Sequence, residues 1–341
     1  MNIDNKIKMS LNKNIPIAVT MGEPGGINSE LIIKTYKNTQ IPNFFLIADP
    51  EWIEKSLIAL KLKSEINIIS CPEESKKGFL NIFPISNKVR FGFKKSYQSN
   101  VPAIIESLDI AIKLALNKKV DGIVTLPILK ETLIKAGFKY PGHTEYLGEK
   151  TASKPLMILF NEKIKVASLT THIPIRKVSE KITKKSICDA IEIMNKSLKN
   201  DFGIANPKIV ISSLNPHGGE GGTIGSEEID IIIPSIIKMQ SLGFDVYGPI
   251  SADTIFSEPE INKHDAKICM FHDQALIPVK TLDFYGTVNF TAGLPIVRTS
   301  PDHGTALNIA GEKEANNLSL RKAITFASII SKNRKRNEKR T

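Results

Sequence analysis

Strand-like and helix-like segments alternate along most of this 341-residue chain. Apolar runs such as IPIAVT (15–20), FFLIAD (44–49) and GIVTLP (122–127) are typical of buried strands, and residues 101–119 have the apolar spacing of a long helix. Such alternation predicts an α/β architecture with largely parallel sheets. Further strands are expected at 66–70, 156–160, 166–171, 208–214, 267–271 and 287–293, and helices at 185–202, 226–243 and 318–335. The polar segment 70–100 is expected to be an irregular excursion from the sheet.

The composition predicts a soluble globular protein, with 41% hydrophobic and 24% charged residues. The most apolar stretch, IDIIIPSIIKM (229–239), contains Asp230 and Pro234, so we expect no membrane span. The first fourteen residues are polar and lack the apolar core of a secretory signal. The three cysteines are far apart and have no CxxC spacing, which predicts free, buried thiols and a cytoplasmic protein, because the cytoplasm is reducing.

The formal net charge of +11 is concentrated near the ends of the chain. The tail KNRKRNEKR (332–340) holds six basic residues and one acid, and we interpret it as a solvated, partly frayed helix end. No basic stripe interleaved with aromatic residues accompanies it, so a nucleic-acid partner is not favoured. The mild positive charge of the remaining chain suits a small anionic substrate.

Three of the six histidines share one context, the end of a strand-like run. His172 closes VASLTTH, His217 follows KIVISSLNP, and His272 closes KICMFH. Ligands of parallel α/β sheets gather at the carboxyl ends of strands. Three imidazoles match the ligand count of a catalytic zinc centre, and they also suit cobalt or nickel, whereas magnesium would need added oxygen ligands. The alternative is three satisfied polar side chains without a metal.

Other polar clusters are consistent with an anion site. TMGEPGGINSEL (20–31) is a glycine-rich turn between a strand and a helix, where backbone amides favour negative charge, although it lacks both nucleotide fingerprints, GxGxxG and GxxxxGK[ST]. His143 and Thr144 open a helix, and Lys280, Asn289 and Arg298 follow His272 at short intervals. The fork of Arg298 is suited to a carboxylate or a phosphate.

The chain resembles the 4-hydroxythreonine-4-phosphate dehydrogenase family of vitamin B6 biosynthesis. The resemblance runs from about Pro16 to Ser328 and is carried most specifically by LNPHGGEGG (214–222) and RTSPDHGTAL (298–307). It implies an isocitrate/isopropylmalate dehydrogenase-like fold, with two α/β/α subdomains separated by a cleft, in a homodimer with shared active sites. The implied subdomains are residues 15–125 with 286–336, on the nucleotide-binding side, and residues 126–285, on the metal and dimer side.

Carried over position by position, the resemblance implies roles for individual residues. The metal ligands would be His172, His217 and His272, and the substrate contacts His143, Thr144, Lys280, Asn289 and Arg298. The nucleotide would contact His303, Gly304, Thr305, Ala306 and Asn308. Asn28 and Gly218 depart from the family, which commonly has glycine and alanine there; Asn28 is expected to cap a helix.

The reaction implied by the resemblance is an NAD- or NADP-dependent oxidation of 4-phosphooxy-L-threonine, assisted by zinc, magnesium or cobalt. The 3-keto acid formed would decarboxylate to 3-amino-2-oxopropyl phosphate. Lys280 would be an acid/base or a phosphate contact, and Asp253 and Asp273 would orient imidazoles. Alternatives are a paralogous dehydrogenase of 4-phospho-threonate or 4-phospho-erythronate, an acyltransferase of the phosphate acetyltransferase kind, and a nucleic-acid-binding protein.

Overall fold

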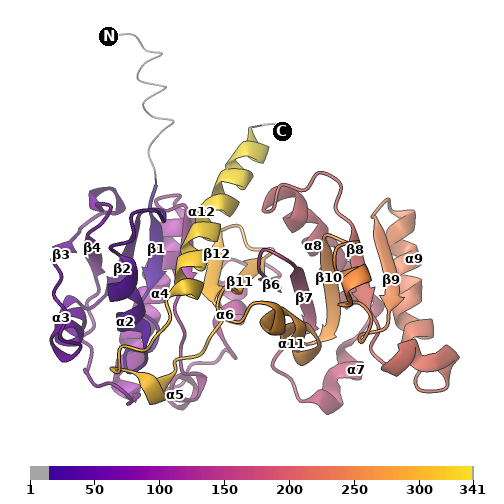
Figure 1. The fold of residues 1–341 in the computed structure, drawn as a ribbon, viewed down its shortest axis with the longest axis horizontal. Helices are drawn as coiled ribbons and strands as arrows, with labels where there is room; N and C mark the ends of the chain where they lie inside the picture. Colours follow the sequence, from indigo (N-terminus) through magenta and orange to yellow (C-terminus); the bar gives the residue numbers. More distant parts are fainter. Residues whose placement is uncertain (1–14, 340–341) are drawn as a thin grey trace, which may run out of the picture. The chain divides into compact units, whose positions relative to one another are not determined.

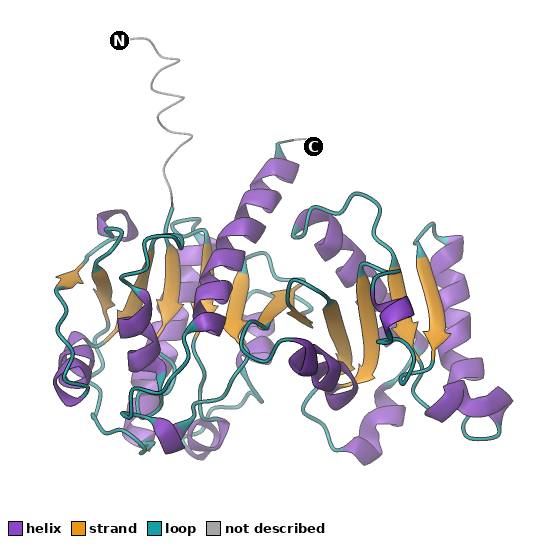
Figure 2. Cartoon of the chain, viewed as in Figure 1, coloured by secondary structure: helices purple, strands orange, loops and turns teal. Residues whose placement is uncertain are grey.

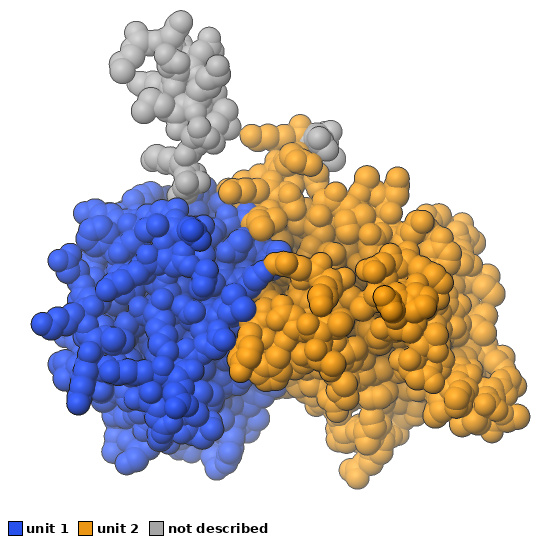
Figure 3. Space-filling model, in the orientation of Figure 1, with its two compact units in different colours: residues 1–138, 303–328 blue, residues 139–302, 329–341 orange. Residues whose placement is uncertain are grey.

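The computed structural model describes residues 15–339 and divides the chain into two compact units. Unit 1 contains residues up to Phe138 together with His303–Ser328, and unit 2 contains Lys139–Asp302 together with the residues from Ile329 onward (Figure 3). The expectation about a secretory signal concerns residues 1–14 and lies outside the described residues. No helix within residues 15–339 is long and apolar enough to cross a membrane.

Unit 1 is built on a parallel sheet with the strand order β3–β4–β2–β1–β5 (Figure 1). The central strand β1 pairs with β2 on one side and β5 on the other, so Val19 lies opposite both Leu46 and Val124. All three side chains are fully buried. The strands are β1 (Ile17–Thr20), β2 (Phe44–Ala48), β3 (Ile66–Ile68), β4 (Leu80–Pro84) and β5 (Gly122–Thr125).

Strand β4 corrects the expectation that residues 70–100 leave the sheet. Leu80 and Ile82 alternate with Asn81, and all three are buried. The Asn81 side chain donates to the carbonyl oxygens of Lys76, Phe79 and Phe44, which satisfies an amide that the sequence pattern marks as a loop residue.

Helices flank the sheet of unit 1 because each has one apolar face. On α4, Ile104, Leu108 and Ala111 are buried at helical spacing, and the Ser107 hydroxyl donates to the Ile47 carbonyl at 2.7 Å. The helices of unit 1 are α2 (Asn28–Thr35), α3 (Pro50–Ala59), α4 (Val101–Leu116) and α5 (Lys130–Lys135).

Unit 2 contains a mixed sheet with the strand order β12–β11–β6–β7–β10–β8–β9. Strands β7, β10, β8 and β9 are parallel neighbours, whereas β6, β11 and β12 run antiparallel to theirs. The expectation of largely parallel sheets therefore holds for unit 1 and only for one side of unit 2. The strands are β6 (Leu156–Phe160), β7 (Lys165–Thr170), β8 (Ile209–Ser212), β9 (Val246–Ile250), β10 (Ala266–Phe271), β11 (Val288–Ala292) and β12 (Arg298–Pro301).

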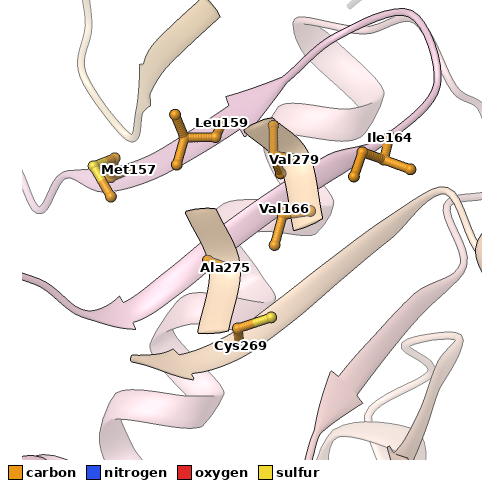
Figure 4. Packing of buried hydrophobic residues seen from close by; sticks show 7 residues of the cluster. All are labelled: Met157, Leu159, Ile164, Val166, Cys269, Ala275 and Val279. Carbon is orange, nitrogen blue, oxygen red and sulfur yellow. The ribbon is translucent and has the colours of Figure 1, made fainter. Parts of the chain in front are cut away.

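Two helices cover this sheet on opposite faces, as side chains alternate across the strands. Met157, Leu159 and Cys269 pack on the face under Ala275 and Val279 of α11 (Figure 4). On the other face, the Phe160 ring meets Phe202 just after α8, with centroids 5.2 Å apart. The helices of unit 2 are α6 (His143–Lys150), α7 (Val178–Lys181), α8 (Lys184–Asn200), α9 (Ile233–Ser241), α10 (Glu258–Ile261) and α11 (His272–Leu282), and α12 (Leu318–Glu338) ends in it (Figure 2).

The unit boundaries differ from those inferred from the resemblance. Residues 286–302, expected in the first subdomain, belong to unit 2 because β11 pairs along its whole length with β6. Residues 126–138 belong to unit 1. All three cysteines are free, as expected; Cys188 and Cys269 are buried, and Cys71 is partly exposed.

The basic end of α12 makes structural contacts with the end of α8, whereas we expected a solvated, partly frayed helix end. The Arg334 Nε donates to Asp201 Oδ1 at 2.5 Å, and Asp201 is buried. Asn333 and Asn337 donate to the carbonyl oxygens of Asp201 and Lys199, which lie at the end of α8. The last carbonyls of a helix have no partner within it, so these amides satisfy groups that would otherwise stay unpaired.

We predict that Arg334→Ala destabilises unit 2 by about 2 kcal/mol, because it leaves the buried Asp201 carboxylate without its cation. Urea denaturation followed by circular dichroism measures the change. Arg336→Ala removes an exposed charge from the same turn and is the matched control. Equal stability of the two variants would contradict a structural role for the Arg334 pair.

Candidate functional site

The three strand-end histidines lie at one edge of the unit 2 sheet. Strands β7, β10 and β8 are adjacent and parallel, so their carboxyl ends meet at the same edge. His272 directly follows β10, His172 follows β7 after one residue, and His217 lies in the loop after β8. The sequence pattern therefore predicted which edge of the sheet carries the imidazoles.

Two of the three imidazoles are close to each other. The ring centroids of His172 and His272 are 5.7 Å apart. The His272 Nδ1 lies 2.7 Å from Asp273 Oδ1. A carboxylate only accepts hydrogen bonds, so Nδ1 is the donor and Nε2 is the nitrogen that remains available to a metal. His172 has a left-handed backbone, with φ of 52°, which turns its side chain at the strand end.

The loop that carries His217 has an unusual backbone. Residues 217–221 all have positive φ, between 42° and 78°, and two of them are not glycine. A left-handed conformation costs a residue with a side chain about 1–2 kcal/mol. The glycine-rich composition thus allows the tight left-handed turn, and His217 itself is exposed at its start.

Glu228 holds this loop and was missed as a site residue by the sequence analysis. Its buried carboxylate accepts from the backbone amides of Leu214 and Asn215, at 2.7 and 2.8 Å, and from the Asn215 side chain at 2.8 Å. The only sequence signal was its place as an acid near the start of the helix expected at 226–243. Three charge-assisted hydrogen bonds make it instead the main support of the His217 loop.

Asp253 is the neighbour of His217 from the loop after β9. Hydrogen bonds from Ser251 and Thr254 hold the pKa of Asp253 below its usual value, and the His217 imidazole adds a smaller electrostatic effect in the same direction. Asp253 is exposed and ionised at neutral pH, which leaves it able to orient an imidazole or to contact a ligand.

Imidazole nitrogens suit a divalent metal such as zinc, but the three histidines do not come together as one metal site within a single chain. Across residues 15–339, no group of three or more histidine, cysteine, aspartate or glutamate side chains is arranged to hold a metal ion. The imidazole rings of His172 and His272 are near one another, whereas His217 interacts electrostatically with Asp253.

Arg298, the first residue of β12, is the most buried charged group among the predicted substrate contacts. Its side chain is 3% exposed, and its Nη1 donates to Thr291 Oγ1 at 2.8 Å. Burial lowers the pKa of Arg298 to about 10, and the nearby Glu145 carboxylate counteracts part of this shift. The guanidinium remains charged at neutral pH, which suits an anionic ligand.

The other predicted substrate contacts also lie in unit 2. His143 and Thr144 are the first two residues of α6. The Asn289 Oδ1 is buried on β11 and finds no hydrogen-bond partner among residues 15–339. The Lys280 Nζ lies 3.4 Å from Asp302 Oδ2, and its side chain is 30% exposed.

The predicted nucleotide loop lies in unit 1 and packs on the glycine-rich turn. The Thr305 carbonyl accepts from the Ile27 amide at 3.1 Å, and a Cβ on Gly26 would come within 2.4 Å of the same oxygen. Glycine is thus required for the two loops to approach. His303, Gly304, Ala306 and Asn308 lie in the same segment, and Ala306 has a left-handed backbone.

Asn28 does not cap α2, contrary to our expectation. It is the first residue of that helix, and the residue at the cap position, Ile27, has no side-chain acceptor. The buried Asn28 amide donates instead to the carbonyls of Met21, Glu23 and Pro127. Asn28 therefore holds the glycine-rich turn in place, and the predicted nucleotide loop packs against that turn.

Cavities do not single out these residues. A hollow of about 590 Å³ lies between the ends of α8 and α12 and contains none of the predicted site residues. A second, of about 510 Å³, runs along α11 and includes Asp273 and Lys280 with Leu276, Ile277 and Phe284. We assign the site from the chemistry of the strand ends, because the first hollow brings together no catalytic groups.

We predict that Gly219→Ala disrupts the His217 loop, since a Cβ there would lie 2.6 Å from the Gly225 carbonyl oxygen and 2.9 Å from Glu228 Oε2. Turnover and melting temperature should both fall. Gly218→Ala is the control, because its φ is similarly positive but no atom lies within 4 Å of the added Cβ. Thermal melting and steady-state kinetics compare the two; an equal loss in both would show that backbone strain alone matters.

Comparison with known proteins supports the family inferred from the motifs. Residues 40–327 match the family model described as pyridoxal phosphate biosynthetic protein PdxA. The 4-hydroxythreonine-4-phosphate dehydrogenase of Caulobacter vibrioides is 38% identical over 333 residues, covering 94% of this chain and 98% of the relative. That of Bacteroides thetaiotaomicron is also 38% identical and covers 94% and 90%.

Solved structures show the same relationship. The 4-hydroxythreonine-4-phosphate dehydrogenase of Klebsiella pneumoniae superposes with a TM-score of 0.83 at 35% identity, over 93% of this chain and 99% of that one. A terephthalate 1,2-cis-dihydrodiol dehydrogenase from Burkholderia xenovorans, 23% identical, shares the fold with a TM-score of 0.62. With the motif resemblance confirmed over nearly the whole length, the chain belongs to the PdxA family.

Proposed function

We propose that this protein is a dehydrogenase that oxidises 4-phosphooxy-L-threonine with NAD or NADP in pyridoxal phosphate biosynthesis. The 3-keto acid formed loses carbon dioxide to give 3-amino-2-oxopropyl phosphate. The observation that carries the proposal is the edge of the unit 2 sheet, where two imidazoles lie together on adjacent strands in a chain of this family.

Arg298 and the start of α6 would bind the anionic groups of the substrate. The buried guanidinium gives a strong, fixed positive charge, and His143 and Thr144 lie where helix amides favour an anion. The unpaired Asn289 Oδ1 would accept a hydrogen bond from the ligand. Lys280, whose Nζ faces the Asp302 carboxylate, would move a proton or contact the phosphate.

A divalent metal, zinc first among the candidates, would be held by His172, His217 and His272. Bound there, it would supply Lewis acidity, which lowers the pKa of a coordinated hydroxyl and stabilises negative charge on that oxygen. Asp273 would fix the orientation of the His272 ring, and Asp253 that of His217. Glu228 would act through the loop backbone.

The nucleotide would bind in unit 1, along residues 303–308. The Ile27 amide holds that loop by donating to the Thr305 carbonyl, and the exposed Gly304 and Asn308 are open to a ligand. The buried Glu23 side chain, which accepts from the Ser96 hydroxyl and the Gly25 amide, keeps the adjoining turn in place.

We further propose a homodimer in which two chains complete each metal site. Two facts support it: the three histidines do not group within one chain, and large apolar side chains are exposed beside Lys280. Ile277, Phe284 and Tyr285 are each more than half exposed at the end of α11. A second copy of the chain would cover them and bring in its own imidazole.

Reduced nicotinamide should form when the protein is mixed with 4-phosphooxy-L-threonine and NAD, and a chelator should abolish the signal. His217→Ala should retain the fold and lose at least about a hundredfold in turnover, because a metal ligand is removed. His264→Ala, in a surface turn, is the control. Full activity of His217→Ala after chelation would rule out the metal site.

Co-expression of His217→Ala with His172→Ala chains tests the shared site. If His217 and His172 of one site come from different chains, each mixed dimer has one intact site, and a random mixture regains about a quarter of wild-type activity. If all ligands come from one chain, no activity returns. Sedimentation analysis of the mixture confirms that the dimers form.

A further inference from the structure

Glu145 lies among the proposed substrate groups, yet nothing so far assigns it a role. It follows His143 and Thr144 in the first turn of α6. Its Oε1 is 4.0 Å from the His172 Nδ1, and its charge acts on the buried guanidinium of Arg298. The carboxylate is thus close to a proposed metal ligand and also acts electrostatically on the proposed anion contact.

One oxygen of this carboxylate is unsatisfied. The Glu145 Oε2 is buried and accepts no hydrogen bond from the described residues. A buried carboxylate oxygen without a donor is costly, and proteins rarely keep one unless a ligand or ion supplies the partner. The Arg298 guanidinium does not meet this need, since Oε2 stays unpaired beside it.

The proposed substrate carries a donor that no other residue of the site accounts for. 4-Phosphooxy-L-threonine has an ammonium group on the carbon next to the one that bears the reacting hydroxyl. The hydroxyl would lie near His172 and an anionic group near Arg298. An ammonium between them falls beside Glu145, the acid that is near both.

We propose that Glu145 binds the α-ammonium group of the substrate and so selects an amino acid over the corresponding hydroxy acid. This inference rests on the proposed function. The pair is charge-assisted, and although the Glu145 side chain is 33% exposed, the oxygen that would accept from the ammonium is buried. A hydroxy acid in the same position offers only a neutral O–H donor, so the carboxylate keeps a hydrogen bond but loses the ion pair, and the amino acid is preferred.

Two structural roles compete with this one. Glu145 would also act as a counter-ion for Arg298, or would hold the His172 ring in one orientation. Both roles affect every substrate alike, because neither depends on the group at the amino-bearing carbon. Only contact with the ammonium makes the effect of a substitution depend on the substrate.

The test compares Glu145→Gln with wild type on 4-phosphooxy-L-threonine and on 4-phospho-threonate, which has a hydroxyl in place of the amino group. Gln keeps the shape and removes the charge. We expect kcat/KM for the amino acid to fall about a hundredfold, with that for the hydroxy acid unchanged or raised. Glu145→Asp, which keeps the charge, should retain part of the preference.

Glu149→Gln is the matched control, since Glu149 lies one turn further along α6, is exposed, and accepts from the Tyr140 hydroxyl. It should leave both values unchanged. A loss of the same size on both substrates in Glu145→Gln, or no loss, would overturn the inference.

Calorimetric titration with the phosphorylated amino acid separates this inference from the proposed function. If wild type binds it but does not oxidise it, the function is wrong, and weaker binding by Glu145→Gln still supports ammonium recognition. If wild type oxidises it and Glu145→Gln keeps the same substrate ratio, the function stands and the inference fails. Absence of binding by wild type would refute both.

Discussion

Parallel pairing of β7, β10 and β8 is the constraint on which the candidate site depends. It brings three chain segments, separated by 45 and 55 residues, to one edge of the unit 2 sheet. Backbone hydrogen bonds fix these strands, and buried residues such as Val166, Cys269 and Ile211 keep their register. His172 and His272 therefore adjoin rigid strands, whereas His217 stands in a loop that other contacts must hold.

The loop after β8 shows how the fold supports an unfavourable backbone. Five consecutive left-handed residues would not persist alone, and glycine removes the penalty at only some of them. The Glu228 carboxylate supplies the compensation by accepting three hydrogen bonds from Leu214 and Asn215. Carboxylates are thus used in two ways in unit 2. The buried carboxylate of Glu228 is hydrogen-bonded and holds structure, whereas the partly exposed Glu145 has one buried oxygen without a partner among the described residues.

Much of the fold could be predicted from the sequence, because buried strands are local apolar runs with a clear period. The strands β1, β2, β3, β5, β6, β7, β8, β10 and β11 fall within the segments expected, to within a few residues. Three others, β4, β9 and β12, were not anticipated, since a polar or proline residue interrupts each apolar pattern. Helix α11 was missed because its first residue is His272 and Pro278 lies inside it.

The sequence by itself determined the α/β class, the positions of most strands, the edge at which the histidines gather and the family, because each depends on local pattern or on continuous motifs. Tertiary structure alone decided that β11 and β12 join unit 2, that Asn28 clamps a turn instead of capping a helix, and that Arg334 binds Asp201. It also decided that the Glu228 carboxylate accepts three hydrogen bonds, whereas the Glu145 Oε2 accepts none from the described residues. The physical reason is that strand direction and the burial of a polar group depend on partners far away in the chain, and no local pattern encodes those partners.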